Sequence, residues 1–110
     1  MKQGEIWSGI LDPTVGSEQA GFRPVVIISG DAMNDHMHEV IICPLTTQLK
    51  RYKANVILEP TESNRLKKTS EIICHQVRYL AKHRLVKKIG NITKEELEQT
   101  KKGLNEILTY

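Results

Sequence analysis

The apolar residues of this chain come in short runs rich in β-branched side chains, and polar turns separate the runs without an intervening helix. The clearest run is Val25-Val26-Ile27-Ile28, which is typical of a buried strand. Because helices do not alternate with these runs, a doubly wound parallel sheet is not expected. The pattern predicts a small, strongly bent sheet or barrel, with strands at residues 4–11, 22–29, 39–45, 55–58, 69–74 and 85–89.

The end of the chain carries the one clear helical pattern. Thr93 and Glu96 have the spacing of a capping box, which satisfies free amides at a helix start. Residues 30–35 predict a turn with at most one short helical turn, and residues 75–80 either continue the fifth strand or bend away from it. The fold class is therefore mainly β (α+β), with about five to seven strands and a C-terminal helix. The residues expected to pack this helix on the sheet are Leu97, Thr100, Leu104, Ile107 and Leu108.

The length of 110 residues predicts a single domain over residues 1–110. No apolar run approaches the ~20 residues that span a bilayer, and the first residues do not resemble a signal peptide. We therefore expect no membrane association and a cytoplasmic location. In a reducing compartment Cys43 and Cys74, each within an apolar segment, are expected to be free and buried. Neither has the ligand spacing of a zinc site.

Several classes of site are excluded or disfavoured by the residue pattern. Gly16 and Gly21 are not followed by the Lys and Ser/Thr of a phosphate loop, so NTPase chemistry is not expected. His36 and His38 have no third convergent ligand, which favours surface histidines over a metal site. A cysteine next to His75 on a strand points to the opposite face, so a thiol nucleophile activated by that histidine is not expected.

Polar residues at the ends of predicted strands are the candidates for a functional site. Arg23 ends the polar segment Gly16–Pro24 and offers a planar fork of donors that suits phosphate. The alternative is a solvated arginine in a hairpin loop. Thr46, Thr47 and Gln48 follow a buried strand, where hydroxyl groups either cap a turn or hold a phosphate oxygen.

Two further features also leave alternatives open. His75 either faces solvent or serves a site as an acid or base near neutral pH. Lys50 and Arg51 belong to a basic connector that is either simply solvated or adds salt-dependent attraction for a phosphate backbone. The net charge of +3 is concentrated in residues 56–110, a mild bias that is compatible with a polyanionic partner.

Taken together, these segments resemble the MazF/PemK toxins of bacterial toxin–antitoxin systems. The matching segments are Gly4–Trp7, Asp12–Ser29, Pro44–Gln48 and Gln76–Arg78, and the likeness covers essentially the whole chain. The most specific part is the string Gly-Ser-Glu-Gln-x-Gly-x-Arg-Pro. The resemblance implies an SH3-like barrel that forms a homodimer. It also implies a metal-free, cofactor-free endoribonuclease that cuts single-stranded RNA/mRNA at short sequences, and a cognate antitoxin that blocks the site.

The resemblance implies roles for individual residues by position. It places the catalytic arginine on Arg23 and the catalytic threonine on Thr46. An arginine with a pKa above about 12 is a poor general base, so Glu18 and His75 are candidate acid–base groups, although His75 lies outside the family's motifs. The residues expected to contact RNA are Ser17, Glu18, Gln19, Phe22, Thr47, Gln48, Lys50, Arg51, Gln76 and Arg78, with Tyr52 as a further candidate base reader.

Metal-free RNA cleavage uses the 2′-hydroxyl of the substrate as nucleophile and leaves a 2′,3′-cyclic phosphate and a 5′-hydroxyl. The enzyme positions the strand and stabilises charge on the phosphate. An alternative is a non-enzymatic toxin on the same barrel that binds and poisons DNA gyrase. That activity requires a tryptophan-glycine type of C-terminus, whereas this chain ends in Thr109-Tyr110 and its single tryptophan is Trp7. A third alternative is a protein that only binds, against which the intact Arg23 and Thr46 argue.

Overall fold

The structure, a computed structural model, describes residues 1–11 and 21–110. Short antiparallel strands are its main secondary structure, as the sequence predicts. The strands are β1 (Glu5–Ile10), β2 (Phe22–Ile27), β3 (Glu39–Thr46), β4 (Val56–Leu58), β5 (Ser70–Ile72), β6 (Arg78–Ala81) and β7 (Leu85–Asn91). The helical elements are α1 (Asp31–His36), the 3-10 turns η1 (Cys74–Gln76) and η2 (Lys82–Arg84), and α2 (Lys94–Thr109).

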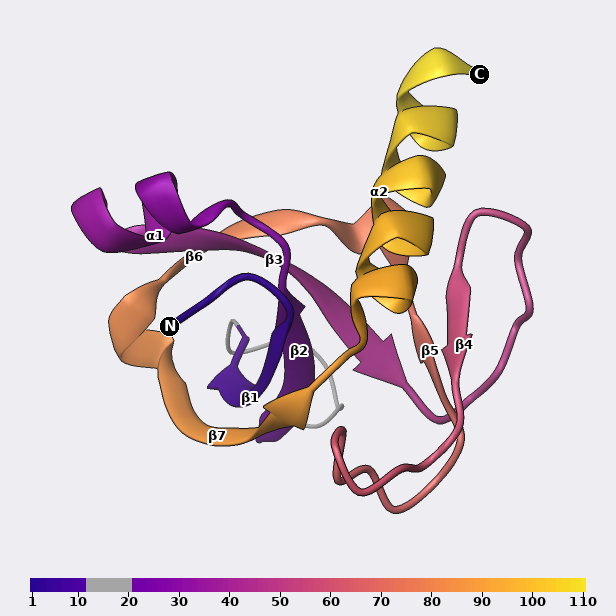
Figure 1. Cartoon of the computed structure of the whole chain (residues 1–110), viewed down its shortest axis with the longest axis horizontal. Coiled ribbons are helices and arrows are strands. Elements are labelled where there is room, and N and C mark those ends of the chain that lie inside the picture. Colours follow the sequence, from indigo (N-terminus) through magenta and orange to yellow (C-terminus); the bar gives the residue numbers. More distant parts are fainter. Residues whose placement is uncertain (12–20) are drawn as a thin grey trace.

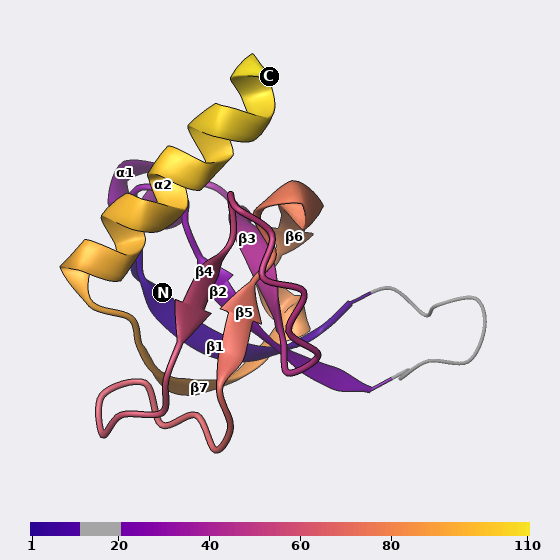
Figure 2. The same cartoon turned by 90° about the vertical axis from the view of Figure 1, so that its right-hand side faces the viewer.

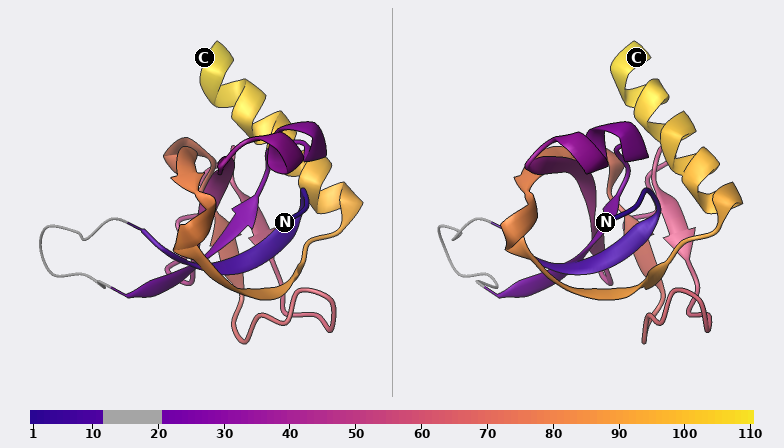
Figure 3. Two further views of the ribbon diagram at one scale, coloured as in Figure 1. Left: turned by 90° about the vertical axis from the view of Figure 1, so that its left-hand side faces the viewer. Right: turned by 60° about the vertical axis from the view of Figure 1, so that its left-hand side comes forward.

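The strands form one curled sheet with β3 at its centre. The order is β4-β5-β3-β2-β1-β7, and β6 pairs with β3 outside that path. One edge of β3 pairs with β2, while its other edge pairs with β6 over its first half and with β5 at its end. Figures 1 and 3 show the resulting half-barrel, in which β1 and β7 curve around the interior. Because β3 ends between β2 and β5, residues from three strands meet there.

The apolar run at residues 25–28 is buried on both faces of the sheet. Val25 and Ile27 belong to one core cluster, together with Val40 and Ile42 of β3. Val26 and Ile28 belong to a second cluster on the opposite face. Successive residues of a strand point to opposite faces, so a strand with a core on each side needs apolar residues at every position. This explains why the run is continuous instead of alternating.

The helix α2 begins where the capping box predicts. The Thr93 hydroxyl accepts a hydrogen bond from the Glu96 amide at 3.0 Å, and the Glu96 carboxylate accepts one from the Thr93 amide at 2.8 Å. Both bonds satisfy amides that the first turn of a helix leaves without partners.

One face of α2 packs on the second core cluster through Leu97, Leu104 and Ile107, and Thr100 is fully buried. The prediction for Leu108 was wrong, because this side chain is 83% exposed. Figures 1 and 2 show the reason: α2 (yellow) lies against β4 in its first turns, and its last turns extend beyond the sheet. Helical spacing predicts which residues share a face, but it does not predict how far the underlying sheet reaches.

The structure shows the course of residues 75–80 and the conformation of residues 30–35, both of which the sequence left open. After β5 the chain bends away through η1, and β6 then returns along β3. Residues 31–36 form a short helix, longer than the single turn expected, and the buried Asn34 ties it to the Ser29 carbonyl at 2.9 Å. Cys43 and Cys74 are buried and free, as predicted. No helix within the described ranges is long and apolar enough to cross a membrane.

Candidate functional site

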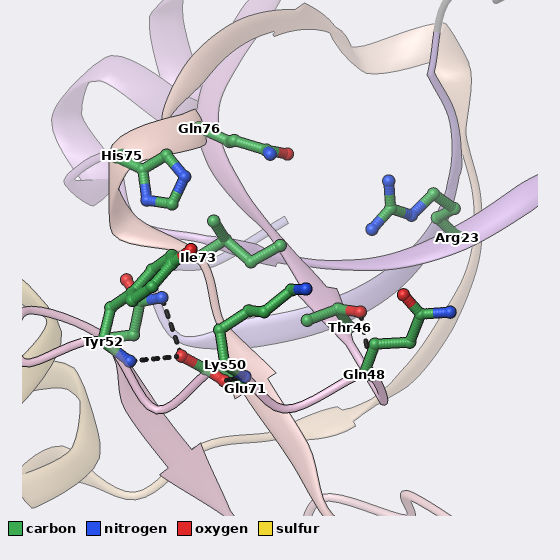
Figure 4. A pocket seen from close by; sticks show the side chains of 10 residues that line it. Arg23, Thr46, Gln48, Lys50, Tyr52, Glu71, Ile73, His75 and Gln76 are labelled. Atoms are coloured by element: carbon green, nitrogen blue, oxygen red, sulfur yellow. Dashed lines mark hydrogen bonds between the residues drawn. The ribbon is translucent and has the colours of Figure 1, made fainter.

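A pocket of about 300 Å³ opens at the end of β3, where β2, β5 and η1 converge. It is polar and carries both charged and amide side chains. Figure 4 shows Arg23 on one side of the pocket and the side chains of His75 and Gln76 on the other. The residues that line it are Arg23, Thr46, Gln48, Lys50, Tyr52, Asn55, Glu71, Ile73, His75 and Gln76.

The strand register brings Arg23 and Thr46 together. Val25 pairs with Pro44 across β2 and β3, and continuing this antiparallel register by two residues places Arg23 opposite Thr46. Residues directly opposite each other in an antiparallel pair lie on the same face of the sheet, so both side chains reach the pocket from the same surface. The Arg23 guanidinium donates a hydrogen bond from Nη2 to the Leu45 carbonyl oxygen at 3.2 Å. This bond holds the guanidinium at the end of β3.

Both groups keep hydrogen-bonding capacity for a ligand. Within residues 1–11 and 21–110, the bond to Leu45 is the one hydrogen bond of the Arg23 side chain, so most of its five N–H donors remain available. The Thr46 hydroxyl oxygen accepts from the Gln48 amide at 3.0 Å, which leaves the hydroxyl proton free to donate. The Thr46 hydroxyl can therefore cap the turn and donate to a phosphate oxygen at the same time.

The carboxylate of Glu71 lies beneath the pocket and fixes the connector between β3 and β4. It is fully buried. Its Oε1 accepts from the amides of Lys50 and Arg51 at 2.6 and 2.9 Å, and its Oε2 accepts from the Tyr52 amide at 3.2 Å. The side chain of Asn55 donates to the same Oε2 at 2.8 Å. Every donor that a buried carboxylate requires is thus supplied by one short segment.

Burial alone would raise the pKa of the Glu71 carboxyl. The hydrogen bonds from Arg51, Asn55, Lys50 and Tyr52 favour the ionised form more strongly, and together they lower the pKa of Glu71 below its ordinary value. The group is therefore a carboxylate near neutral pH. Its negative charge is directed at backbone amides, which leaves the positive charges of Arg23 and Lys50 to face the pocket (Figure 4).

The 3-10 turn η1 forms the wall opposite Arg23. His75 and Gln76 are exposed at its surface, and Figure 4 shows the Gln76 amide extending into the pocket. The Tyr52 ring lies against the His75 ring, with centroids 5.8 Å apart and planes tilted by 54°. This wall therefore offers an amide, an imidazole and an aromatic face, the kinds of group that recognise unpaired bases by their edges and by stacking.

The structure brings together some of the residues predicted from the sequence and leaves others apart. Arg23, Thr46, His75 and Gln76 line the pocket, as do Gln48, Lys50 and Tyr52. Ser17, Glu18 and Gln19 lie outside the described residues. In the described part of the chain, four predicted RNA contacts are not among the lining residues: Phe22, Thr47, Arg51 and Arg78.

Those four residues lie in different parts of the fold. Phe22 is the first residue of β2, and Thr47 directly follows the end of β3. Arg51 contributes its backbone amide to Glu71 and has a positive φ of 57°. Arg78 lies on β6, opposite Ile42 of β3. Phe22 is 61% exposed at the open end of the β1–β2 pair.

Three lining residues were missed: Asn55, Glu71 and Ile73. Glu71 carried a usable signal, because it is a charged residue between Ser70 and Ile72 in a predicted strand. Buried carboxylates are rare unless they have partners. No pattern in the sequence indicates that its partners would be backbone amides some 20 positions earlier.

The pocket chemistry suits an anion flanked by planar polar groups. A guanidinium, an ammonium and a hydroxyl donate toward one space, and an imidazole is available for proton transfer. The thiol of Cys74 is buried in the core beneath the wall, and Cys74 and His75 lie in a 3-10 turn and not in the strand that the sequence predicted. Among the described residues, no three His, Cys, Asp or Glu side chains are grouped as a metal site.

Comparisons with known proteins point in one direction. Residues 2–108 match the family model described as PemK-like, MazF-like toxin of type II toxin-antitoxin system. The chain is 32% identical to an endoribonuclease MazF of Staphylococcus saprophyticus over 106 residues, covering 96% of this chain and 88% of that protein.

Solved structures share the same fold. The chain is similar to MazF of Deinococcus radiodurans, with a TM-score of 0.81, 23% identity and coverage of 100% of this chain and 97% of that one. It is also similar to a mycobacterial endoribonuclease solved in complex with its cognate antitoxin, with a TM-score of 0.79, 21% identity and coverage of 98% and 94%.

Proposed function

Since the chain belongs to the PemK-like, MazF-like toxins of type II toxin–antitoxin systems, we propose that it is a sequence-specific, metal-independent endoribonuclease that cleaves single-stranded RNA. The observation that carries this proposal is the meeting of Arg23 and Thr46, from two separate strands, in one open polar pocket. Both side chains line the same space. The proposed reaction uses these two groups and requires no bound metal.

The proposed reaction is an in-line attack within the substrate. The 2′-hydroxyl oxygen forms a bond to the adjacent phosphorus while the bond from phosphorus to the 5′-oxygen breaks. A base takes the proton of the 2′-hydroxyl, and an acid gives a proton to the leaving 5′-oxygen. The products are a 2′,3′-cyclic phosphate and a 5′-hydroxyl.

Arg23 and Thr46 act on the phosphate oxygens. Negative charge grows on these oxygens as phosphorus becomes five-coordinate, and donors fixed in advance stabilise that charge more than they stabilise the ground state. The guanidinium supplies permanent charge in a forked geometry, and the Thr46 hydroxyl supplies a second hydrogen bond. Lys50 adds attraction for the strand.

Proton transfer falls to a smaller set of groups. His75 is on the pocket wall and exposed, and an imidazole exchanges protons readily near neutral pH. Glu18, outside the described residues, is the second candidate. In the family mechanism the arginine itself takes part in acid–base work, and Arg23 would then do so here.

The proposal includes partners and a place of action. The pocket wall formed by Tyr52, His75 and Gln76 contacts bases next to the cut. The protein acts as a homodimer in the cytoplasm, and a cognate antitoxin covers the groove. The antitoxin complex of a mycobacterial relative with the same fold supports this last point.

The test is to incubate the protein with a long RNA in EDTA and to map both ends of every cut. Discrete cuts with cyclic phosphate and 5′-hydroxyl ends are expected. Intact RNA would overturn the proposal, and intact RNA together with inhibition of DNA gyrase would point to the gyrase-poisoning alternative. Cuts that appear only when a divalent metal is supplied would contradict the proposed chemistry.

A further inference from the structure

The Glu71 carboxylate connects two segments of the pocket wall, the connector at residues 50–55 and the turn η1. On one side it accepts hydrogen bonds from the amides of Lys50, Arg51 and Tyr52. On the other side it accepts from Asn55, whose Oδ1 in turn accepts from the Cys74 amide at 2.9 Å. That amide belongs to the first residue of η1.

A contact at the surface joins the same two segments a second time. Tyr52, whose amide donates to Glu71, places its ring against the ring of His75 on η1. The backbone amide of Asn55 donates to the Tyr52 carbonyl oxygen at 3.0 Å. The connector is thus also held by a hydrogen bond within it. One buried carboxylate thereby determines the spacing between the connector that carries Lys50 and Tyr52 and the turn that carries His75 and Gln76.

From this connectivity we propose that Glu71 is a positioning residue, which acts through Asn55 and the 50–52 backbone to hold Tyr52, His75 and Gln76 as one rigid wall that binds an unpaired RNA base. The inference rests on the proposed function, because it concerns how that RNA is read. Glu71 contacts no substrate in this role. It keeps the aromatic ring, the imidazole and the amide fixed relative to one another, and a loosened wall binds more weakly and discriminates less between bases.

A purely structural role is the competing explanation, and the chain offers a matched comparison. Asn64 is also a buried polar side chain that organises a loop, outside the pocket lining. Its Oδ1 accepts from the amides of Thr61 and Leu66 at 2.9 and 3.0 Å, and its Nδ2 donates to the Glu59 carbonyl at 2.9 Å. Replacing Asn64 loosens a loop and lowers stability without touching the wall.

The experiment compares Glu71→Gln, Asn55→Ala and Asn64→Ala with the unmodified protein. Circular dichroism first sets a temperature at which each variant is folded. Initial rates on a defined RNA then give kcat and KM, and sequencing of all cut ends in a long RNA gives the base preference around the cut. Asn55→Ala breaks the connection to η1 and keeps the three backbone bonds, so it carries the test if Glu71→Gln does not fold.

The proposal predicts that KM changes much more than kcat. Glu71→Gln and Asn55→Ala raise KM about 10- to 100-fold and broaden the base preference, while kcat changes much less. Asn64→Ala keeps the KM and the preference of the unmodified protein. Combining Glu71→Gln with Tyr52→Ala costs less than the product of the two single effects, because both damage the same wall.

Three results would overturn the inference: an unchanged KM and preference in the folded Glu71→Gln and Asn55→Ala variants, a loss of kcat alone, or effects equal to those of Asn64→Ala. Failure of the proposed function looks different. In that case the folded, unmodified protein leaves RNA intact, whereas failure of this inference alone leaves an active enzyme whose cut sites do not depend on Glu71.

Discussion

Thr46 on β3 lies directly opposite Glu71 on β5. The register of β2 and β3 continues the same row to Arg23, so three polar residues stand side by side across three strands. Their roles differ, because Arg23 and Thr46 face the pocket with free donors, whereas Glu71 organises the connector behind it. The site is thus a consequence of strand register, and the predictions below test its parts separately.

The hydroxyl of Thr46 is expected to matter for the chemical step. Thr46→Val keeps the shape of the side chain and removes the donor, so kcat falls about 100-fold, as for loss of one donor to a developing oxyanion. Thr46→Ser keeps the hydroxyl and serves as the control, with a kcat within a few-fold of the unmodified protein. Steady-state rates on one defined RNA measure both. Equal activity of the valine variant would remove Thr46 from the reaction.

The ammonium of Lys50 is expected to act on the RNA backbone through charge. Lys50→Gln removes one phosphate contact, so the slope of log affinity against log salt becomes shallower by about 0.7, the value for a single strand. Binding of an RNA with a 2′-deoxy sugar at the cut position measures this without cleavage. Lys102→Gln, at an exposed position of α2, is the charge-matched control and keeps the original slope. Identical slopes in both variants would place Lys50 outside the RNA path.

The Glu71 carboxylate makes stability depend on acid pH. Burial opposes ionisation, but the hydrogen bonds to the connector lower the folded-state pKa of Glu71 below its ordinary value of 4.5. The stabilisation is therefore complete above that ordinary value and is lost as the pH falls through the folded-state pKa.

Glu71→Gln removes this contribution and replaces one carboxylate oxygen with an NH2 group, so some of the buried donors lose their acceptor, at a cost of about 2 kcal/mol near neutral pH. Urea unfolding followed by Trp7 fluorescence measures the difference between the two proteins. This difference shrinks as the pH falls below 4.5, the ordinary value for the carboxyl, because the unmodified protein then takes up a proton on unfolding. A difference that stays constant from neutral to acid pH would show that Glu71 titrates alike in both states.

Gly103 permits the close approach of α2 to the segment behind the pocket. A Cβ at this position would lie 2.0 Å from the Ala54 carbonyl oxygen and 3.1 Å from the Cys74 sulfur. Alanine normally stabilises a helix by about 1 kcal/mol relative to glycine, but here the clash outweighs this gain. Gly103→Ala is expected to lower the free energy of unfolding by about 2 kcal/mol.

The control for this prediction lies on the same helix. Asn105 is exposed, so Asn105→Ala benefits from helix propensity without a clash and raises stability by a few tenths of a kcal/mol. Thermal unfolding by circular dichroism compares the two variants. If Gly103→Ala also gained stability, the contact between α2 and Ala54 would be looser than described.

Much of the fold could be predicted from local patterns. The strands around residues 5–10, 22–27, 39–46 and 85–91 are each marked by apolar runs between polar turns, and the helix start is marked by Thr93 and Glu96. These features depend on neighbours in the sequence. The exposure of Leu108 and the bend of the chain at η1 depend on where the sheet ends, which no local pattern contains.

The candidate site was predictable in part for the same reason. Arg23 and Thr46 stand at strand ends within recognisable motifs, and the structure brings them to one pocket. Glu71 was missed because its role depends on β5 pairing with the end of β3, a contact between segments 25 residues apart in number. Its one visible signal was a charge inside a buried strand.

The most direct test of the central claim, that the guanidinium of Arg23 acts on the RNA phosphate, is single-turnover cleavage in EDTA by Arg23→Ala. The matched control is Arg84→Ala, which also removes a guanidinium that donates to a strand carbonyl, that of Ile10 at 3.3 Å, but outside the pocket lining. We expect folded Arg23→Ala, with the circular dichroism of the unmodified protein, to leave RNA uncut while Arg84→Ala cleaves at the original sites. Cleavage by Arg23→Ala at the rate and sites of the unmodified protein would contradict the account.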